Sequence, residues 1–281
     1  VDGKVRIFRP DENAKRIRKS AERLGMAAPP EEMFIRMCQM CVKENIDFLP
    51  PYGYNASMYL RPVIEGINPQ INICPSEEVI FAVMCLPVGN YSKAASLCPV
   101  DAVISRDYDR AAPNGTGCFK IAANYAMSLY PYTMAHKLGY TELLFLDPAT
   151  KSCVDEFGSS NFIGIKGNTY VTPLSKSVLP SITNKSLRTL AEDIGMKVEM
   201  RSVPVEEIAE FDEIDACGTA VVITPIKSIT DKPRLEGKEI TKKYQMPSME
   251  KCGRASLKLY GLIRGIQNGE EQDIHEWCFE L

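Results

Sequence analysis

Residues 110–125 read RAAPNGTGCFKIAANY, and the pattern of the chain changes within this stretch. Its first half belongs to residues 107–117, which are dense in turn-forming and charged residues and have no apolar period, as is typical of a connection. Its second half opens residues 119–138, which carry Ala, Tyr, Met and Leu at helical spacing before Gly139 as a C-cap. The pattern predicts an N-terminal domain over 1–106, a connection over 107–117 and a larger C-terminal domain over 118–281.

The N-terminal part shows predicted helices followed by predicted strands. Residues 11–24 and 31–44 have helical spacing, and strand-like runs follow at residues 58–64, 79–86 and 102–105. Helices followed by strands, rather than strict alternation, predict an α+β fold. The opening run VDGKVRIFRP reads as a strand that begins abruptly, as if the first strands of this domain lay upstream.

The C-terminal part alternates short strands with two further helices. The patterns predict helices at 186–195 and 249–267, and strands at 142–146, 153–155, 161–165, 169–172, 198–202 and 215–223. Lys166-Gly167-Asn168 is a turn signal that predicts a hairpin between two of these strands.

Length and charge narrow the class of protein. A chain of 281 residues exceeds what one hydrophobic core usually supports, so two cores are expected. The net charge of -3, with Lys and Arg scattered among Asp and Glu, gives no general attraction to nucleic acid or to anionic lipid. No run is long and apolar enough for a transmembrane helix, and no secretory signal pattern is visible. We therefore expect a soluble protein that acts on small molecules.

The ten cysteines predict a reducing compartment. They are dispersed and mostly in apolar surroundings, unlike the disulfide framework of a small secreted domain, so we expect the cytoplasm. Cys38 and Cys41 form a CxxC pair, but no second pair or histidine pair completes a metal site. Because they fall on the apolar face of a predicted helix, we interpret them as core residues rather than a redox pair and expect no bound metal.

Lys120 is the strongest candidate for covalent chemistry. Apolar neighbours, Phe119 and Ile121, would dehydrate its amine and make it available as a nucleophile. Most lysines are solvated surface groups, so the local pattern alone leaves both readings open. The sequence GTGCFK fits neither phosphate-loop pattern, and the two histidines, His136 and His275, have no triad partners nearby.

Several motifs resemble the fold type IV pyridoxal-5′-phosphate (PLP) enzymes, in particular the branched-chain amino acid aminotransferases. In that family the Schiff-base lysine stands just before Gly-Gly-Asn-Tyr, and this chain has Lys120 before Ala122-Ala123-Asn124-Tyr125. Further matches occur in the family's order: YLRP at 59–62, DEFGSSNFI at 155–163, LPSIT at 179–183 and GTAVVITPIKSI at 218–229. The resemblance implies a smaller α/β N-terminal domain and a larger C-terminal domain with a barrel-like sheet.

The resemblance also implies which residues bind PLP. Lys120 would form the Schiff base and shuttle a proton, Tyr125 would bond the phenolic oxygen of the cofactor, and Glu156 would face its ring nitrogen. The phosphate would be held by the Arg16 guanidinium and by backbone amides of a helix-opening turn made of Ser181, Ile182 and Thr183. Thr219 and Ser159 would add hydroxyl groups.

For substrates, the resemblance implies a pocket for branched-chain amino acids. Tyr59 and Arg61 match the family's YxR motif, and the amides of Thr219 and Ala220 would bind the α-carboxylate. An apolar pocket separates leucine, isoleucine and valine only weakly, and glutamate and 2-oxoglutarate must also enter. The family further implies a homodimer or a larger homo-oligomer.

The sequence departs from the family at Ala122-Ala123 and Ser181, where glycines are usual, and at Asn184, where arginine is usual. Three alternatives stay open: a D-amino acid aminotransferase, an aminodeoxychorismate lyase, and an inactive homologue that keeps the fold.

Overall fold

The computed structural model describes residues 2–89, 97–247 and 251–281, and the chain divides into two compact units. The first unit comprises Val1–Lys93 together with Arg264–Leu281, and the second comprises Ala94–Ile263. Within the described residues no helix is long and apolar enough to span a bilayer.

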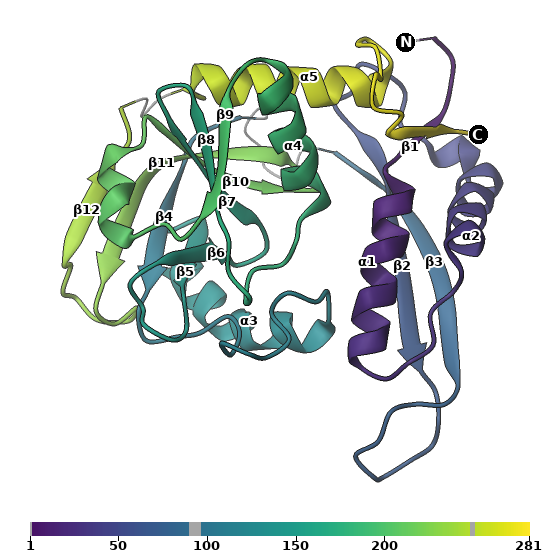
Figure 1. Cartoon of the computed structure of the whole chain (residues 1–281), viewed down its shortest axis with the longest axis horizontal. Helices are drawn as coiled ribbons and strands as arrows, with labels where there is room; N and C mark the ends of the chain where they lie inside the picture. The colour runs from purple at the N-terminus through teal and green to yellow at the C-terminus, as the bar shows by residue number, and fades with distance from the viewer. Residues whose placement is uncertain (1, 90–96, 248–250) are drawn as a thin grey trace. The chain divides into compact units, whose positions relative to one another are not determined.

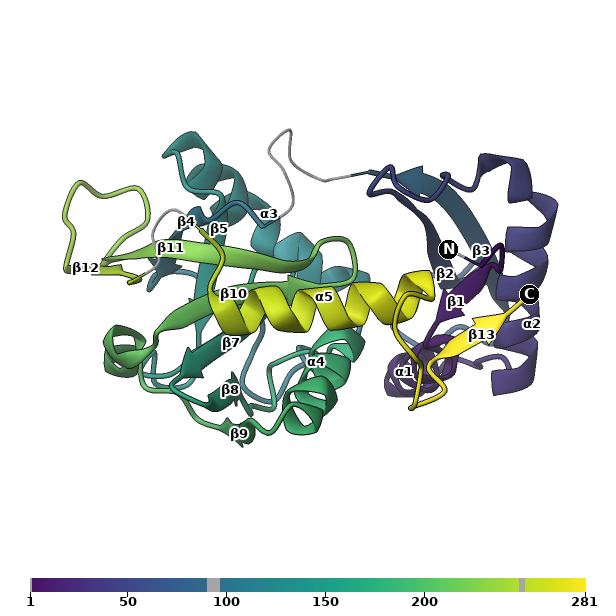
Figure 2. The same ribbon diagram turned by 90° about the horizontal axis from the view of Figure 1, so that it is seen from above.

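The first unit packs two helices against one face of a long antiparallel strand pair (Figure 1). Its elements are β1 (Arg6–Phe8), α1 (Pro10–Arg23), α2 (Glu31–Glu44), η1 (Ile46–Phe48), β2 (Ser57–Gly66), β3 (Val79–Val88) and β13 (Cys278–Glu280). Phe34 of α2 stacks on Phe81 of β3 with ring centroids 5.6 Å apart. β1 pairs with β13, so the two ends of the chain lie side by side in this unit (Figure 2).

Of the CxxC pair, Cys38 belongs to the core of the first unit, as predicted, and Cys41 is half-buried. Cys38 is buried on the face of α2 that carries Phe34 and Val42. Burial raises the pKa of the Cys38 thiol to about 12, so the reactive thiolate is disfavoured. No cluster of three metal-ligating side chains occurs among the residues that the structure describes.

The second unit is built on a sheet that closes on itself. Its strands are β4 (Val100–Ser105), β5 (Glu142–Leu146), β6 (Val154–Phe157), β7 (Asn161–Lys166), β8 (Thr169–Pro173), β9 (Lys197–Arg201), β10 (Glu213–Gly218), β11 (Val222–Lys232) and β12 (Lys242–Gln245). The order β10-β11-β4-β5-β6-β7, with a further pairing of β7 to β10, closes a ring of six strands. Figure 2 shows β10 between β11 and β7. The expected α+β class and barrel-like sheet are confirmed.

Apolar side chains fill this unit, and helices cover it. The core includes Leu144, Phe157, Phe162 and Ile214, all nearly inaccessible to solvent. The other elements are α3 (Ala122–Lys137), α4 (Ile182–Asp193), η2 (Val205–Glu210) and α5 (Arg254–Asn268), of which α5 begins in this unit and ends in the first.

The division into units differs from the predicted domains. β4 was expected in the N-terminal domain, but it pairs in parallel with β5 and β11 and so belongs to the second unit. The predicted connection, residues 107–117, also lies within the second unit, and β13 returns to the first. The composition of a strand shows that it is a strand but not which strand it will pair with, and this is why the boundary was misplaced.

Several element boundaries also differ from the sequence patterns. The strand predicted over 215–223 is two strands, β10 and β11, joined by a turn at residues 219–221. α3 starts three residues later than predicted, because Lys120 and Ile121 remain extended or irregular. α4 starts four residues earlier, because the Ser181 side chain caps it. α5 starts at Arg254, and residues 249 and 250 of its predicted first turn lie outside the described residues.

A buried acidic cluster fixes the start of α5. The Ser256 hydroxyl oxygen lies 2.6 Å from a Glu213 carboxyl oxygen and 2.5 Å from one of Asp215. Since a hydroxyl has one hydrogen to donate, one of the two contacts requires a proton on a carboxyl group. Burial raises the pKa of Asp215 to about 7, and the Glu213 charge adds to this effect while the Ser256 hydrogen bond opposes it. Asp215 is therefore the partner that holds the proton below about pH 7.

We expect Asp215→Asn to stabilise the protein at alkaline pH. The folded chain holds a proton on Asp215 that the unfolded chain releases at its ordinary, lower pKa, so wild-type stability falls as the pH rises from about 4 to about 7. The variant lacks this titration, and above neutral pH it should be more stable by on the order of 2 to 4 kcal/mol. Urea unfolding at a series of pH values measures this, and equal slopes against pH in both proteins would contradict the assignment.

Candidate active site

Lys120 and Tyr125 form the first pair of the site. Lys120 lies two residues before α3, and Tyr125 lies in the first turn of that helix. The Lys120 Nζ donates a hydrogen bond of 2.8 Å to the Tyr125 hydroxyl and lies 5.1 Å from the centre of its ring. The expectation that apolar neighbours dehydrate the Lys120 amine is wrong, since the Lys120 side chain is exposed to solvent. The amine is thus open to a ligand from solvent.

Asn124 holds the loop that carries Lys120. Its side-chain amide donates to the carbonyl oxygens of Thr116, at 2.7 Å, and Phe119, at 2.8 Å. Its carbonyl oxygen accepts a hydrogen bond of 2.7 Å from the Thr116 hydroxyl. The side chain is buried and all its polar atoms are bonded, so the loop is fixed against the start of α3.

Glu156 is a buried carboxyl group on β6. One of its oxygens accepts from the Leu179 amide at 2.9 Å, and the other accepts from the Asn161 side chain at 2.8 Å. The Arg110 guanidinium lies 2.5 Å from the first oxygen. Burial raises the pKa of Glu156 to about 7, against the Arg110 charge and the two hydrogen bonds, which lower it. A carboxyl group poised near neutrality can hold or release a proton at working pH.

Arg110 connects Glu156 to the Lys120 loop. Its guanidinium donates to the carbonyl oxygen of Gly117, at 2.9 Å, and to that of Ser177. Gly117 packs so closely on this segment that an added Cβ would lie 2.2 Å from the Ser177 oxygen. Sequence reasoning missed Arg110. The only signal in the sequence was an arginine in a stretch dense in turn-forming residues. Nothing in that pattern distinguished Arg110 from an ordinary surface arginine.

The start of α4 lies next to Glu156 through the Leu179 hydrogen bond. The Ser181 hydroxyl accepts from the Asn184 amide at 3.2 Å and caps the helix. The amides of Ile182 and Thr183 belong to the first turn, where no intrahelical carbonyl is available to them. A helix N-terminus of this kind favours an anion such as a phosphate.

The turn between β10 and β11 lies at the same end of the sheet. Cys217 pairs with Asn161, and an added Cβ on Gly218 would lie 3.6 Å from Ser160. The exposed residues Thr219 and Ala220 follow directly, and Ser159 is exposed on the neighbouring turn. The structure therefore places in the second unit the predicted residues Lys120, Tyr125, Glu156, Ser159, Ser181, Ile182, Thr183, Thr219 and Ala220.

Three predicted site residues, Arg16, Tyr59 and Arg61, belong to the first unit. Tyr59 and Arg61 project from the same face of β2, with the Arg61 guanidinium 5.3 Å from the centre of the Tyr59 ring. Arg16 lies on α1 and donates a hydrogen bond of 3.2 Å to the Asn13 side chain. Their roles at a site remain predictions.

Both the sequence and the fold are similar to those of known proteins. The family model for class IV amino-transferases matches residues 2–229. The branched-chain-amino-acid aminotransferase of Helicobacter pylori strain J99 is 41% identical over 99% of this chain and 79% of its own length. The chain belongs to the class IV aminotransferases. A crystal structure of the Escherichia coli branched-chain amino acid aminotransferase, 26% identical, matches with a TM-score of 0.81 over 97% of this chain and 84% of that one.

A second solved structure has the same fold at lower identity. It is the branched-chain amino acid aminotransferase of Thermobaculum terrenum in its PLP form, 23% identical, with a TM-score of 0.79 over 99% of this chain and 84% of that one.

The departures from the family motifs fit the structure of this class IV aminotransferase. Ala122 and Ala123 are exposed in the first turn of α3, and neither they nor Ser181 has the positive φ that would require glycine.

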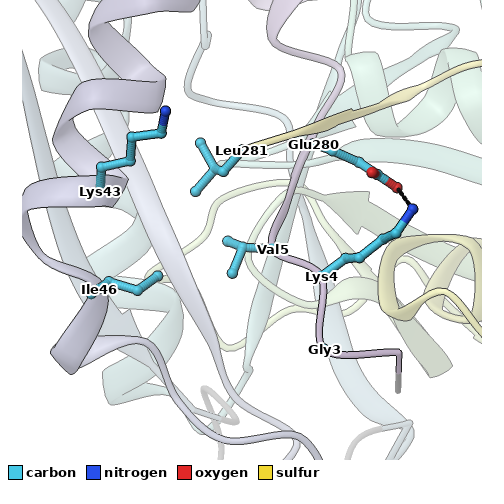
Figure 3. A pocket seen from close by; sticks show the side chains of 7 residues that line it. All are labelled: Gly3, Lys4, Val5, Lys43, Ile46, Glu280 and Leu281. Atoms are coloured by element: carbon cyan, nitrogen blue, oxygen red, sulfur yellow. Dashed lines mark hydrogen bonds and ion pairs between the residues drawn. The ribbon is translucent and has the colours of Figure 1, made fainter.

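A cavity of about 480 Å³ lies in the first unit (Figure 3). It is open to solvent and lined by Gly3, Lys4, Val5, Lys43, Ile46, Glu280 and Leu281. Lys4 is paired with Glu280 at 2.9 Å. The lining residues do not include a lysine beside a phenol and a buried carboxyl group, the set that amino-group transfer with PLP would use. We therefore do not assign the reaction to this cavity.

Proposed function

We propose that the protein catalyses PLP-dependent transamination of leucine, isoleucine and valine with 2-oxoglutarate. The observation that carries the proposal is the joining of Lys120, Tyr125 and Glu156 with the α4 N-terminus in one unit through Arg110 and Leu179. A relative 41% identical over nearly the whole chain, which is named a branched-chain-amino-acid aminotransferase, supports the substrate class.

The donor set fits PLP. The Lys120 amine is exposed next to a phenol, a buried carboxyl group lies between Arg110 and Asn161, and the α4 N-terminus favours a phosphate. Glu156 is the group for a ring nitrogen, because a carboxylate stabilises the protonated form of that nitrogen. When bound, PLP supplies an electron-accepting ring and a carbonyl group that takes up the amino group.

The residues of this chain would then divide the work. Lys120 would anchor the cofactor and, once displaced, act as the base that moves a proton from the substrate Cα. Tyr125 would donate to the phenolic oxygen of the ring and hold the amine in place. Glu156 would keep the ring nitrogen charged, and Arg110 would keep Glu156 ionised for that purpose.

The phosphate would be bound by neutral donors and one cation. The amides of Ile182 and Thr183 supply the helix N-terminus, Arg16 supplies the charge, and the hydroxyl donors are Ser159, Ser181 and Thr219. Because the Ser181 hydroxyl already accepts from Asn184, its one hydrogen remains for the phosphate.

For the substrate, the amides of Thr219 and Ala220 would bind the α-carboxylate, since they lie on an exposed turn. Tyr59 and Arg61 would bind the side-chain carboxylate of glutamate or 2-oxoglutarate, because a guanidinium that stacks on a phenol is oriented for one. The D-amino acid aminotransferase and the lyase alternatives have no observation in their favour.

The proposed function is tested by a transamination panel. The protein is loaded with PLP and incubated with 2-oxoglutarate and leucine, isoleucine, valine or D-alanine, and glutamate is quantified. Glutamate should form with all three branched L-amino acids and not with D-alanine. Failure with every branched substrate, or release of pyruvate from aminodeoxychorismate, would contradict the proposal.

We further propose a homodimer or larger assembly in a reducing cytoplasm. The face of β2 and β3 that does not pack against α1 and α2 exposes Val63, Ile80, Met84 and Leu86, an apolar surface that a second copy would cover. All ten cysteines are unpaired, which suits a reducing compartment. Light scattering of the purified protein tests the assembly, and a monomeric mass at micromolar concentration would contradict it.

A further inference from the structure

A chain of buried amide side chains leads from the start of α4 to Glu156. The Asn161 side chain donates to Glu156 at 2.8 Å and to the Leu179 carbonyl oxygen at 3.0 Å. Both neighbours are acceptors, so the NH₂ end of Asn161 has to face them. The Asn161 carbonyl oxygen must then face the opposite way, where it accepts a hydrogen bond of 3.2 Å from Asn184.

Asn184 is oriented in the same way. Its NH₂ group donates to Asn161 and, at 2.8 Å, to the Thr172 hydroxyl, while its carbonyl oxygen accepts from the Tyr170 hydroxyl at 3.0 Å. The Thr172 hydroxyl uses its own hydrogen on the Phe162 carbonyl, so it can only accept from Asn184. Tyr170 therefore donates to Asn184, Asn184 to Asn161, and Asn161 to the Glu156 carboxyl group.

Burial makes this order costly to break. Tyr170, Asn184, Asn161 and Glu156 are each at most 6% exposed. An unpaired polar group in such a place loses its full hydration, and hydrogen bonds in a series polarise one another in a low dielectric. The charged groups around the series are Arg110 and Asp155 near Glu156, and Arg188 and Asp215 near Tyr170.

Asn184 also belongs to the α4 N-terminus, because its backbone amide bonds the capping Ser181 hydroxyl. One residue thus touches both the turn assigned to the phosphate and, through Asn161, the carboxyl group assigned to the ring nitrogen. The distance between these two sites must match the length of one cofactor molecule.

We propose that Asn184 is a positioning residue that fixes the α4 N-terminus and the Glu156 carboxylate relative to each other through Asn161. The proposal rests on the proposed function, since it assigns the two ends of PLP to these two sites. Asn184 touches no reacting atom. It acts by holding Asn161 in the orientation that donates to Glu156.

The first test uses the cofactor-free protein. Asn184→Leu keeps the size of the side chain and removes its donors, so Asn161 is free to turn its carbonyl oxygen toward Glu156. Infrared spectroscopy would follow the Glu156 carboxyl band, identified by its absence in Glu156→Gln, through a pH titration. The band should titrate at higher pH in Asn184→Leu than in wild type, and an unchanged midpoint would overturn the proposal.

The second test compares ligands that occupy one or both sites. In Asn184→Leu the dissociation constant of PLP should rise by about 10-fold or more, because a hydrogen bond to a charged group contributes that much to affinity. The dissociation constant of inorganic phosphate alone should change by less than about threefold. An equal loss of affinity for PLP and for inorganic phosphate would show a local defect of α4. That result would overturn the proposal that Asn184 couples the α4 N-terminus to Glu156. The control Asn168→Asp, on the exposed turn between β7 and β8, should change neither constant.

Asn184→Asp keeps the tests decisive if the leucine variant does not fold. A neutral aspartic acid can donate its one O–H to Asn161, and an ionised one cannot. The variant should therefore bind PLP nearly as wild type does at acid pH and lose affinity as the pH rises, whereas a pH-independent loss would contradict the role. If the wild-type protein binds no PLP, the proposed function fails. The infrared titration still tests whether Asn184 orients Asn161 toward Glu156, because it uses the cofactor-free protein.

Discussion

Lys120→Ala is expected to abolish transamination. The variant removes the only amine placed beside the Tyr125 hydroxyl among the described residues, and with it both the covalent anchor and the base. The rate of glutamate formation from leucine should fall by about 10²- to 10⁴-fold, the usual worth of a positioned proton-transfer group. Quantifying glutamate after mixing the PLP-loaded variant with leucine and 2-oxoglutarate measures the loss.

Lys137→Ala provides the matched control. Lys137 lies in the last turn of the same helix, α3, and is exposed, so the substitution changes the same charge without touching the site. It should leave the rate within about twofold, as surface substitutions usually have small effects. A Lys120→Ala variant as active as this control would contradict the assignment.

Arg110→Met is expected to cause the largest loss of stability. The substitution leaves Glu156 buried without its cation and removes the donors to Gly117 and Ser177, and breaking a buried pair in this way costs about 3–5 kcal/mol. The loss should grow with pH. Arg110 lowers the pKa of Glu156, so without it the folded chain keeps that proton to higher pH, and stability continues to fall as the pH rises above neutrality.

The double variant Arg110→Met with Glu156→Gln separates the charge from the packing. Because a glutamine needs no counter-charge, the double variant should be more stable than Arg110→Met near pH 8 and should lose the added pH dependence. Arg234→Met, on an exposed loop of the same unit, is the control and should change the free energy of unfolding little. Urea unfolding measures all four proteins, and a double variant no more stable than Arg110→Met would contradict the pairing.

Local patterns in the sequence predicted most of the elements of the fold. α2 begins and ends at the predicted residues, and the predicted strand at 142–146 is β5, because apolar spacing within one element is a local property. The domain boundary failed at β4. Its place in the second sheet depends on parallel pairing with β5 and β11, which are far away in the chain and leave no local mark.

The candidate site divides in the same way. Lys120, Tyr125 and Glu156 stand in short motifs that resemble a known family, so each could be named as a candidate from its own motif. Arg110 could not, because its role comes from three partners in other segments: Gly117, Glu156 and Ser177. The exposure of Lys120 was also mispredicted, since apolar neighbours in sequence need not cover a side chain in space.

Asn184 shows how a departure from a family motif acquires meaning from structure. In the sequence it was only a substitution of a usual arginine. In the fold its amide is buried and bonded to Tyr170, Thr172 and Asn161, so its orientation is determined by its neighbours. Side-chain direction depends on tertiary packing, and no local pattern encodes it.

The covalent attachment of PLP to Lys120 is tested most directly by chemical trapping. The PLP-loaded protein is reduced with borohydride, digested and analysed by mass spectrometry. We expect a phosphopyridoxyl group on the peptide that contains Lys120, and none on that peptide when the protein is incubated with excess leucine before reduction. A modification found on another lysine, or on no peptide of a protein that is active in transamination, would contradict the assignment of Lys120.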